Sequence, residues 1–170
     1  MKAKKTERPE KAFYNLVGTI TTAMYGKRTF ANGKSDKENK YRLSLKCSKQ
    51  AIDGLKEAAE PFYEDVKDDY IPNWYKEDAP ADGGYINLAS GFDIRVGMYE
   101  DGKIVDKGKM VDFINENGGN INGSKVVVSV TIKEGSIYPN AMIIKELKVQ
   151  DISSMFNEDE LDSLFSSMPF

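Results

Sequence analysis

The sequence predicts a mainly β protein: a small antiparallel barrel with helical decoration, one main helix and a flexible acidic C-terminal tail. Segments in which apolar and polar residues alternate, the period of a half-buried strand, recur along the chain. Only one segment of the body has a clear helical period, so helices do not alternate with strands as they do around a parallel sheet. Residues 151–170 change abruptly to acids and phenylalanines. These observations favour a barrel over a βαβ arrangement.

Length and composition indicate one domain in a reducing, aqueous compartment. The 170 residues are 40% hydrophobic and 30% charged, and no apolar run approaches the roughly 20 residues of a membrane span. The basic opening MKAKKTERPEK lacks the apolar segment of a signal peptide, so we expect a cytoplasmic protein. Cys47 is the only cysteine and cannot form an internal disulfide. Because the chain has no histidine, we expect neither a zinc site nor a histidine-based triad.

Charge is distributed unevenly along the chain. There are 24 basic and 27 acidic residues; since the tail holds five acids and no base, the body carries 24 against 22, a net charge of plus 2, and the tail minus 5. Ten acids and three lysines lie between Asp53 and Asp82. The stretch from Lys27 to Lys49 has the opposite imbalance, with two acids against these basic residues: Lys27, Arg28, Lys34, Lys37, Lys40, Arg42, Lys46 and Lys49. We therefore expect one positive and one negative surface.

The chain is expected to begin with a disordered basic segment, residues 1–11, before the body domain, 12–150. Residues 12–25 predict one long strand with a bend or bulge at Gly18, and a polar loop follows. The strict alternation of YRLSLKC, residues 41–47, predicts a half-exposed strand. Its outward residues are Arg42, Ser44 and Lys46.

The main helix is predicted over residues 48–68, with Ser48 as its N-cap and apolar residues at helical spacing. Pro61 is expected to kink or split it. Residues 69–84 predict a long acidic loop that carries Trp74. The rest of the body predicts a strand and hairpin over 85–108 with its turn at 100–103, a mixed connection over 109–123, and two strands within 125–150 around a turn at 134–135.

The basic loop after the first strand is the first candidate site. Its sequence GKRTFANGKS resembles a phosphate-binding loop, but the required first glycine is replaced by Arg28 and no helix follows Ser35. Phe30, flanked by Tyr25 and Tyr41, instead combines flat rings with cations, which is what a single-stranded nucleic acid requires. The alternative is that these rings fill the core and the lysines only keep a loop soluble.

Other charged and aromatic residues give weaker indications. Phe92 and Arg95, three residues apart on a predicted strand, should lie on opposite faces, and Arg95 is either a phosphate contact or the partner of Asp93. Trp74 and Tyr75, in an acidic loop, favour an interface or a barrel cap over DNA stacking. The acidic clusters read as solvated helix ends, so we expect no catalytic residue, no metal and no cofactor.

The tail is predicted to form a short helix and to act as a handle for partner proteins. Asn157 is a good N-cap, Glu160 closes a capping box, and Leu161, Leu164 and Phe165 share one helical face. About ten residues are too few for a stable isolated helix, so a partner surface is needed. Docking on the chain's own barrel is the alternative. The terminal Phe170 places a ring beside the α-carboxylate, a pair suited to an apolar pocket with a basic rim.

The chain combines a β-rich basic body, a final strand MIIKELKVQ and an acidic tail ending in Pro169-Phe170. This combination resembles the single-stranded DNA-binding proteins of bacteria and their phages, and most of all the phage-encoded OB-fold type. The resemblance implies an OB barrel that binds single strands, and a tail that contacts replication, recombination and repair proteins and competes with DNA for the basic groove. The early helix departs from the usual OB order, so either the first segment contains two strands or the barrel is elaborated.

The sequence therefore predicts a non-enzymatic, sequence-nonspecific single-stranded DNA-binding protein, located in the host cytoplasm if a phage encodes it. The alternatives are a protein-interaction or assembly module without nucleic-acid binding and, more remotely, a metal-dependent nuclease; a homo-oligomer is left open, and no membrane contact is expected. The candidate DNA-binding residues are Lys27, Arg28, Phe30, Lys34, Lys40, Tyr41, Arg42, Lys46 and Arg95. The candidate partner-binding residues are Glu158, Asp159, Glu160, Leu161, Asp162, Leu164, Phe165 and Phe170.

Overall fold

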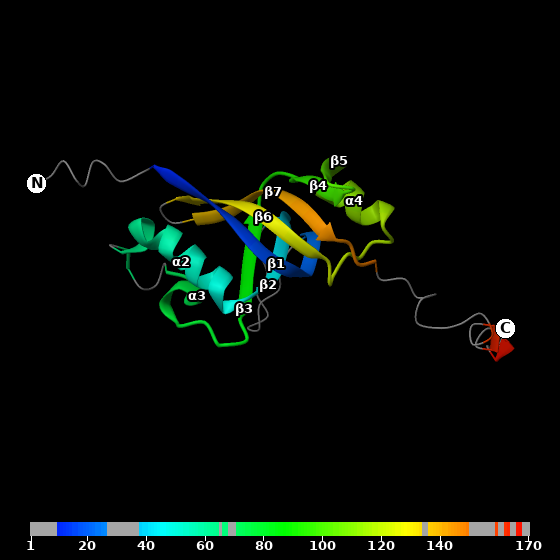
Figure 1. The fold of residues 1–170 in the computed structure, drawn as a ribbon, viewed down its shortest axis with the longest axis horizontal. Helices are drawn as coiled ribbons and strands as arrows, with labels where there is room; N and C mark the ends of the chain where they lie inside the picture. Colours follow the sequence, from blue (N-terminus) through cyan, green and yellow to red (C-terminus); the bar gives the residue numbers. More distant parts are fainter. Residues whose placement is uncertain are drawn as a thin grey trace, which may run out of the picture.

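A computed structural model describes residues 10–26, 38–64, 66–67, 71–133 and 136–149, and in the tail 159, 162–163 and 166–167. The described body is mainly β, as predicted, with its strands in one sheet of order β3-β2-β1-β6-β7-β4-β5 (Figure 1). The strands are β1 Lys11–Gly26, β2 Lys40–Cys47, β3 Gly84–Ser90, β4 Arg95–Glu100, β5 Lys103–Lys109, β6 Lys125–Lys133 and β7 Ser136–Glu146. The described helices of the body are α2 Lys49–Tyr63, α3 Asn73–Lys76 and α4 Met110–Glu116, and residues 159, 162–163 and 166 of the tail are also helical.

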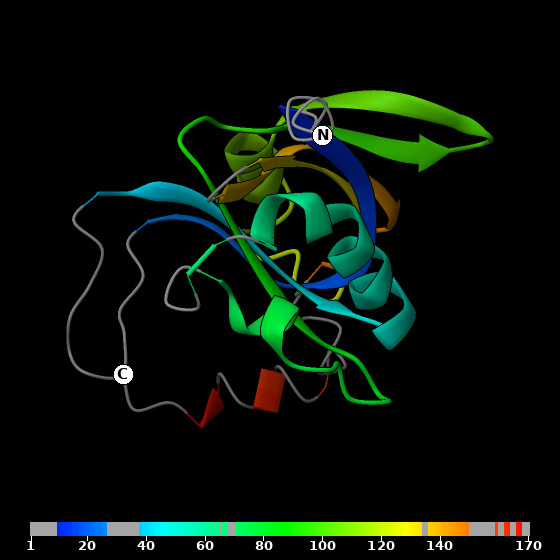
Figure 2. The same ribbon diagram turned by 90° about the vertical axis from the view of Figure 1, so that its left-hand side faces the viewer.

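The sheet curls into an OB-like barrel because its two flanks are joined by a short connection. Strand β4 starts directly after the bend at residues 91–94 that ends β3, and it pairs in parallel with β7, with Arg95 opposite Ala141. β3 itself also lies against β7. All other described strand pairs are antiparallel. β5 extends from β4 as a hairpin that projects from the barrel (Figure 2).

The core is formed by the inward residues of the alternating strands. Leu16 and Ile20 of β1 are at most 1% exposed, and so are the four inward residues of β6. Helix α2 packs its apolar stripe against β1 and β6 (Figure 2). The buried residues of α2 are Ile52, Leu55, Ala59, Phe62 and Tyr63. Burial of a side chain of this size stabilises the fold by about 1.5–3 kcal/mol, so this stripe fixes α2 on the barrel.

The helices show that the barrel is elaborated, while β1 is one strand of 16 residues. When β3 and β4 are counted as one bent barrel strand, α4 follows the third barrel strand and precedes the fourth, which is the usual OB position. α2 is therefore an insertion between β2 and β3. The sequence reading missed α4 and α3, both of which lie in segments expected to be loops or mixed connections.

The structure confirms the predicted helix cap and the predicted hairpin turn. Ser48 caps α2, its hydroxyl oxygen accepting a hydrogen bond from the Ala51 backbone N–H at 3.1 Å. The hairpin turn lies where predicted, with Asp101 and Gly102 both at positive φ, 50° and 80°. Pro61 does not split the helix, which runs unbroken to Tyr63. Within the described body, no helix is long and apolar enough to cross a membrane.

Gly18 serves a different purpose from the predicted bend. The irregularity in β1 lies between Ile20 and Thr22. A Cβ atom on Gly18 would lie 2.9 Å from the Lys46 carbonyl oxygen and 3.0 Å from the Cys47 Sγ. Glycine is required here because β1 and β2 approach each other too closely for a side chain.

Replacing Gly18 with alanine should therefore destabilise the protein, because the added methyl group meets backbone that cannot move away. We expect a loss of about 1–3 kcal/mol in the free energy of unfolding, as for overpacked cores, measured by urea denaturation. Gly91→Ala is the matched control, since a Cβ atom there has no neighbour within 4 Å. Equal stability of the two variants would contradict the close approach of β1 to β2.

Candidate nucleic-acid interface

The outward surface of β2 and β3 contains a lysine stacked on an exposed ring. Lys46 lies opposite Tyr85 in the register of β2 and β3, and opposite Thr19 of β1 on its other side. The Lys46 Nζ is 4.7 Å from the centroid of the Tyr85 ring, and Tyr85 is 61% exposed. The inward neighbours on the same strands are buried, so alternation alone turns this pair away from the core. A cation and a flat ring are thus presented together to solvent.

Of the next two rows of the same surface, the first is polar and the second sets an arginine between two apolar residues. Ser44 donates its hydroxyl to the Asn87 Oδ1 at 2.7 Å. One row further, Arg42 lies between Met24 of β1 and Ala89 of β3. Arg42 has the outward register that the alternation predicts, but it is only 8% exposed and its Nε donates to the Gly26 carbonyl at 3.3 Å, so the expectation of an exposed basic residue is wrong for Arg42. The guanidinium ties the ends of β1 and β2 together.

The cations of the described body fall into groups by partner. Four of them are held by carboxylates, in the pairs Lys49–Asp53, Arg95–Asp106, Lys107–Glu100 and Lys125–Glu146. Three others, which we call the ring-bound lysines, each stand over an aromatic ring: Lys11, Lys46 and Lys133. None of the ring-bound lysines forms an ion pair with a carboxylate of the described residues. Their positive charges are therefore available to attract an anion from solution.

The predicted basic loop lies largely outside the described residues, and so do Lys27, Arg28, Phe30 and Lys34. Lys40 is exposed at the start of β2. Tyr41 is on the inward side of β2, half-buried, and stacks on Tyr25 with ring centroids 4.5 Å apart. Tyr25 is 49% exposed, so this pair borders the loop instead of filling the core.

Arg95 has a partner that the sequence reading did not identify. Its Nη2 donates to the Asp106 Oδ2 at 2.6 Å, whereas Asp93 accepts the Val111 backbone N–H at 3.2 Å. The Gly108 N–H and then the Arg95 guanidinium hold the pKa of Asp106 below its ordinary value. Arg95 is thus already paired with a carboxylate on the surface. Phe92, 49% exposed, lies in the bend before β4 and not on a strand, so the opposite-face argument for Phe92 and Arg95 was wrong.

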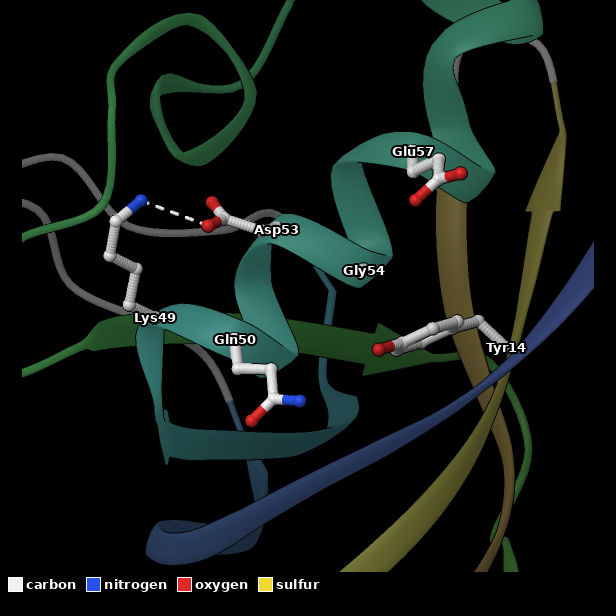
Figure 3. A pocket seen from close by; sticks show the side chains of 6 residues that line it. All are labelled: Tyr14, Lys49, Gln50, Asp53, Gly54 and Glu57. Atoms are coloured by element: carbon white, nitrogen blue, oxygen red, sulfur yellow. Dashed lines mark hydrogen bonds and ion pairs between the residues drawn. The ribbon is translucent and has the colours of Figure 1, made fainter.

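The surface of α2 is the acidic counterpart, and it includes an open hollow of about 570 Å³ (Figure 3). The Tyr14 hydroxyl donates to the Ala51 carbonyl at 3.2 Å and fills the space over Gly54, where a Cβ atom would lie 2.2 Å from it. Burial, then Cys47 and Glu57, raise the pKa of Tyr14, so its hydroxyl stays protonated at neutral pH. Among the described residues that line the hollow, Lys49 is the single lysine, and Asp53 forms an ion pair with it (Figure 3). This hollow does not suit a polyanion.

The remaining acidic and aromatic residues have structural positions. Trp74 and Tyr75 of α3 pack on Tyr63 of α2, with centroids 6.2 and 5.1 Å from the Tyr63 ring, as expected for a cap and not for DNA stacking. Among the described residues, no group of acidic or cysteine side chains could hold a metal ion. Asp159 and Asp162 of the tail are helical and exposed. The other predicted partner-binding residues lie outside the described residues: Glu158, Glu160, Leu161, Leu164, Phe165 and Phe170.

The sequence reading missed the exposed rings on the strands. Tyr85 lies on a predicted strand but is not among the predicted site residues, although the alternation of GYINLAS places it on the other face from the buried Ile86 and Leu88. Phe13, 63% exposed, alternates in the same way with the buried Leu16. An aromatic residue on the polar side of an alternating strand was the signal that could have identified both.

Replacing Arg95 with methionine should raise the pKa of Asp106 only part of the way to its ordinary value, because the larger cause, the Gly108 N–H, remains. NMR titration of the carboxyl carbon measures this change. Lys103→Met is the control, since Lys103 lies opposite Glu100. An unchanged pKa of Asp106 in the Arg95 variant would contradict the ion pair between Arg95 and Asp106.

Comparison with known proteins does not assign the chain to a family. No family model matches the chain. The curated proteins likewise give no match. The arguments for function therefore come from the ring-bound lysines and from the distribution of charge.

Proposed function

We propose that the protein binds single-stranded DNA without sequence preference and has no enzymatic activity. The observation that carries the proposal is Lys46 over the exposed Tyr85 ring, with no described carboxylate to neutralise the lysine. Lysines neutralise phosphates, and an exposed ring stacks on an unpaired base. A role in the replication, recombination and repair of phage DNA follows from the resemblance stated above, and this role is part of the proposal.

Binding of this kind tolerates any sequence, because every base has a flat face. Each stacked base contributes roughly 1–3 kcal/mol, and the remaining affinity is electrostatic and sensitive to salt. Lys40 and the basic residues of the β1–β2 loop, Lys27, Arg28 and Lys34, are the further candidates for phosphate contacts, with Phe30 for stacking. The tail, with a net charge of minus 5, is proposed to compete for these cations and to recruit partner proteins when DNA displaces it.

An apolar strip on another part of the outward surface favours a second candidate, a protein-interaction module. Val17, Val127 and Ile143 lie opposite one another on β1, β6 and β7, and Gly97 of β4 continues the row. Ile104 of β5 covers Gly97, with its Cγ2 2.8 Å from where a Cβ atom would be. Val17 and Ile104 are more than half exposed, so this strip could contact another protein.

Titration with oligo(dT), followed by tyrosine and tryptophan fluorescence at about 50 and about 300 mM salt, tests DNA binding. Affinity should fall with salt at a log-log slope of about 0.7 per phosphate neutralised. Lys46→Ala should lower the slope by about 0.7, and Tyr85→Ala should weaken binding by about 1–3 kcal/mol. Lys125→Ala is the matched control. Lys125 lies in the same row as Lys46, but Lys125 is already paired with Glu146.

The outcomes separate the candidate functions. Absence of binding at low salt would refute the proposal and leave the interaction module. Shortening of the oligonucleotide after magnesium is added would indicate a nuclease. If Lys125→Ala weakens binding as much as Lys46→Ala does, the assignment of Lys46 is wrong.

Deleting residues 151–170 should tighten DNA binding at low salt, because a competing negative charge of 5 is removed. The gain should disappear at high salt, where charges are screened, and partner recruitment should be lost. Measuring affinity for oligo(dT) at both salt concentrations checks this. As a control, a tail in which the five acids are replaced by their amides should behave like the deletion; unchanged or weaker binding would refute competition.

A further inference from the structure

We propose that the outward surface of β1, β6 and β7 carries a second contact site for unpaired nucleic acid. We call it the ring–lysine block and define it by Lys11, Phe13, Lys133 and Tyr138. The inference rests on the proposed function and extends it, because it names a surface that a long strand reaches after the Lys46–Tyr85 pair. Its four residues belong to β1, β6 and β7 and lie outside the sequence of the predicted basic loop and of the tail.

The block has two rings in one row and two cations in the next. Phe13, Thr131 and Tyr138 lie opposite one another across β1, β6 and β7. In the neighbouring row, Lys11 lies directly opposite Lys133. The Lys11 Nζ is 5.6 Å from the Phe13 centroid, and the Lys133 Nζ is 5.5 Å from the Tyr138 centroid.

The surface between the two rings of the block is closely packed. Thr131, between them, is 2% exposed, and its Oγ1 is hydrogen-bonded to the side chain of Asn140 at 2.7 to 2.9 Å. Phe13 is 63% exposed, so its ring contributes little to the core. A large apolar ring left on a strand surface is available for contact with a ligand.

The two lysines of the block repel each other, and a bound anion would relieve this repulsion. Like charges directly opposite each other on neighbouring strands are destabilising. Neither Lys11 nor Lys133 forms an ion pair with a carboxylate of the described body. An anion bound between them relieves the repulsion, and the adjacent rings favour a ligand that also has flat faces. A single-stranded nucleic acid supplies both, phosphates and bases alternating along one chain.

The block is separate from the first site. Thr19, opposite Lys46, is six residues along β1 from Phe13, which is about 20 Å at 3.3 Å per residue. The outward residues between them, Asn15 and Val17, carry no charge. A short oligonucleotide should therefore occupy one site at a time, whereas a longer one can reach both.

The test compares oligo(dT) of about 4 and about 16 nucleotides, the two ends of the range of site sizes for OB folds. In the full-length protein, the double variant Phe13→Ala/Tyr138→Ala should weaken binding of the long oligonucleotide about thirtyfold or more, since two stacked rings are lost. Its affinity for the short oligonucleotide should fall less, because that ligand can still occupy the Lys46–Tyr85 site. In the double variant Lys11→Ala/Lys133→Ala, the salt slope should fall by about 1.4 for the long ligand alone.

Tyr99→Ala is the matched control, because Tyr99 is 54% exposed on β4 and no described lysine stands over its ring. It should bind both ligands like wild type, and thermal melting confirms that each variant is folded. Wild-type affinity of the ring variant for the long ligand overturns the second site and leaves the proposed function standing. Loss of an acidic protein partner with DNA binding intact would assign the block to that protein and also overturn the inference. A wild-type protein that binds neither ligand overturns the proposed function itself.

Discussion

The inward–outward register of β1 is the constraint on which the rest of the structure depends. This strand pairs with β2 along its second half and with β6 along its first, so both parts of the barrel take their register from it. Leu16 and Ile20 are almost completely buried, whereas Phe13 and Val17 are more than half exposed. A slip of one residue would reverse these positions, so burial of the inward residues also fixes which residues face solvent.

The same alternation explains what the sequence could predict and what it could not. It gave the strands, the faces of Leu43 and Leu45 and the outward direction of Lys46, because side chains on a strand have a period of two. Alternation does not predict how exposed an outward side chain is. Arg42 has the predicted face but is covered, since Gly26 and Met24 of the neighbouring strand lie beside it. The ion pair of Arg95 with Asp106 depends on the register of β4 and β5, which shifts after Arg95 and is not visible in sequence spacing.

Local pairing of charges matters more to this surface than the net charge of the body. Lys125 and Lys46 lie in one row, on either side of Thr19. Glu146 neutralises Lys125, but a ring and no described carboxylate accompanies Lys46. Two lysines of equal charge in the sequence therefore present different fields to a polyanion. A body with a net charge of only plus 2 can attract phosphates where its cations are unpaired.

The place where the tail leaves the barrel bears on its proposed competition with DNA. The Lys148 backbone N–H donates to the Ser124 Oγ at 2.7 Å, and the Ile20 N–H donates to the Ser124 carbonyl at 2.9 Å. Lys148, close to the end of the described body, thus lies near Ile20, the neighbour of Thr19, whose row contains Lys46. In the proposed competition, tethering near that row would give the tail acids a high effective concentration at Lys46, so even a weak attraction would be enough. Because salt screens that attraction, the proposed competition is one in which a longer, more highly charged strand would displace the tail.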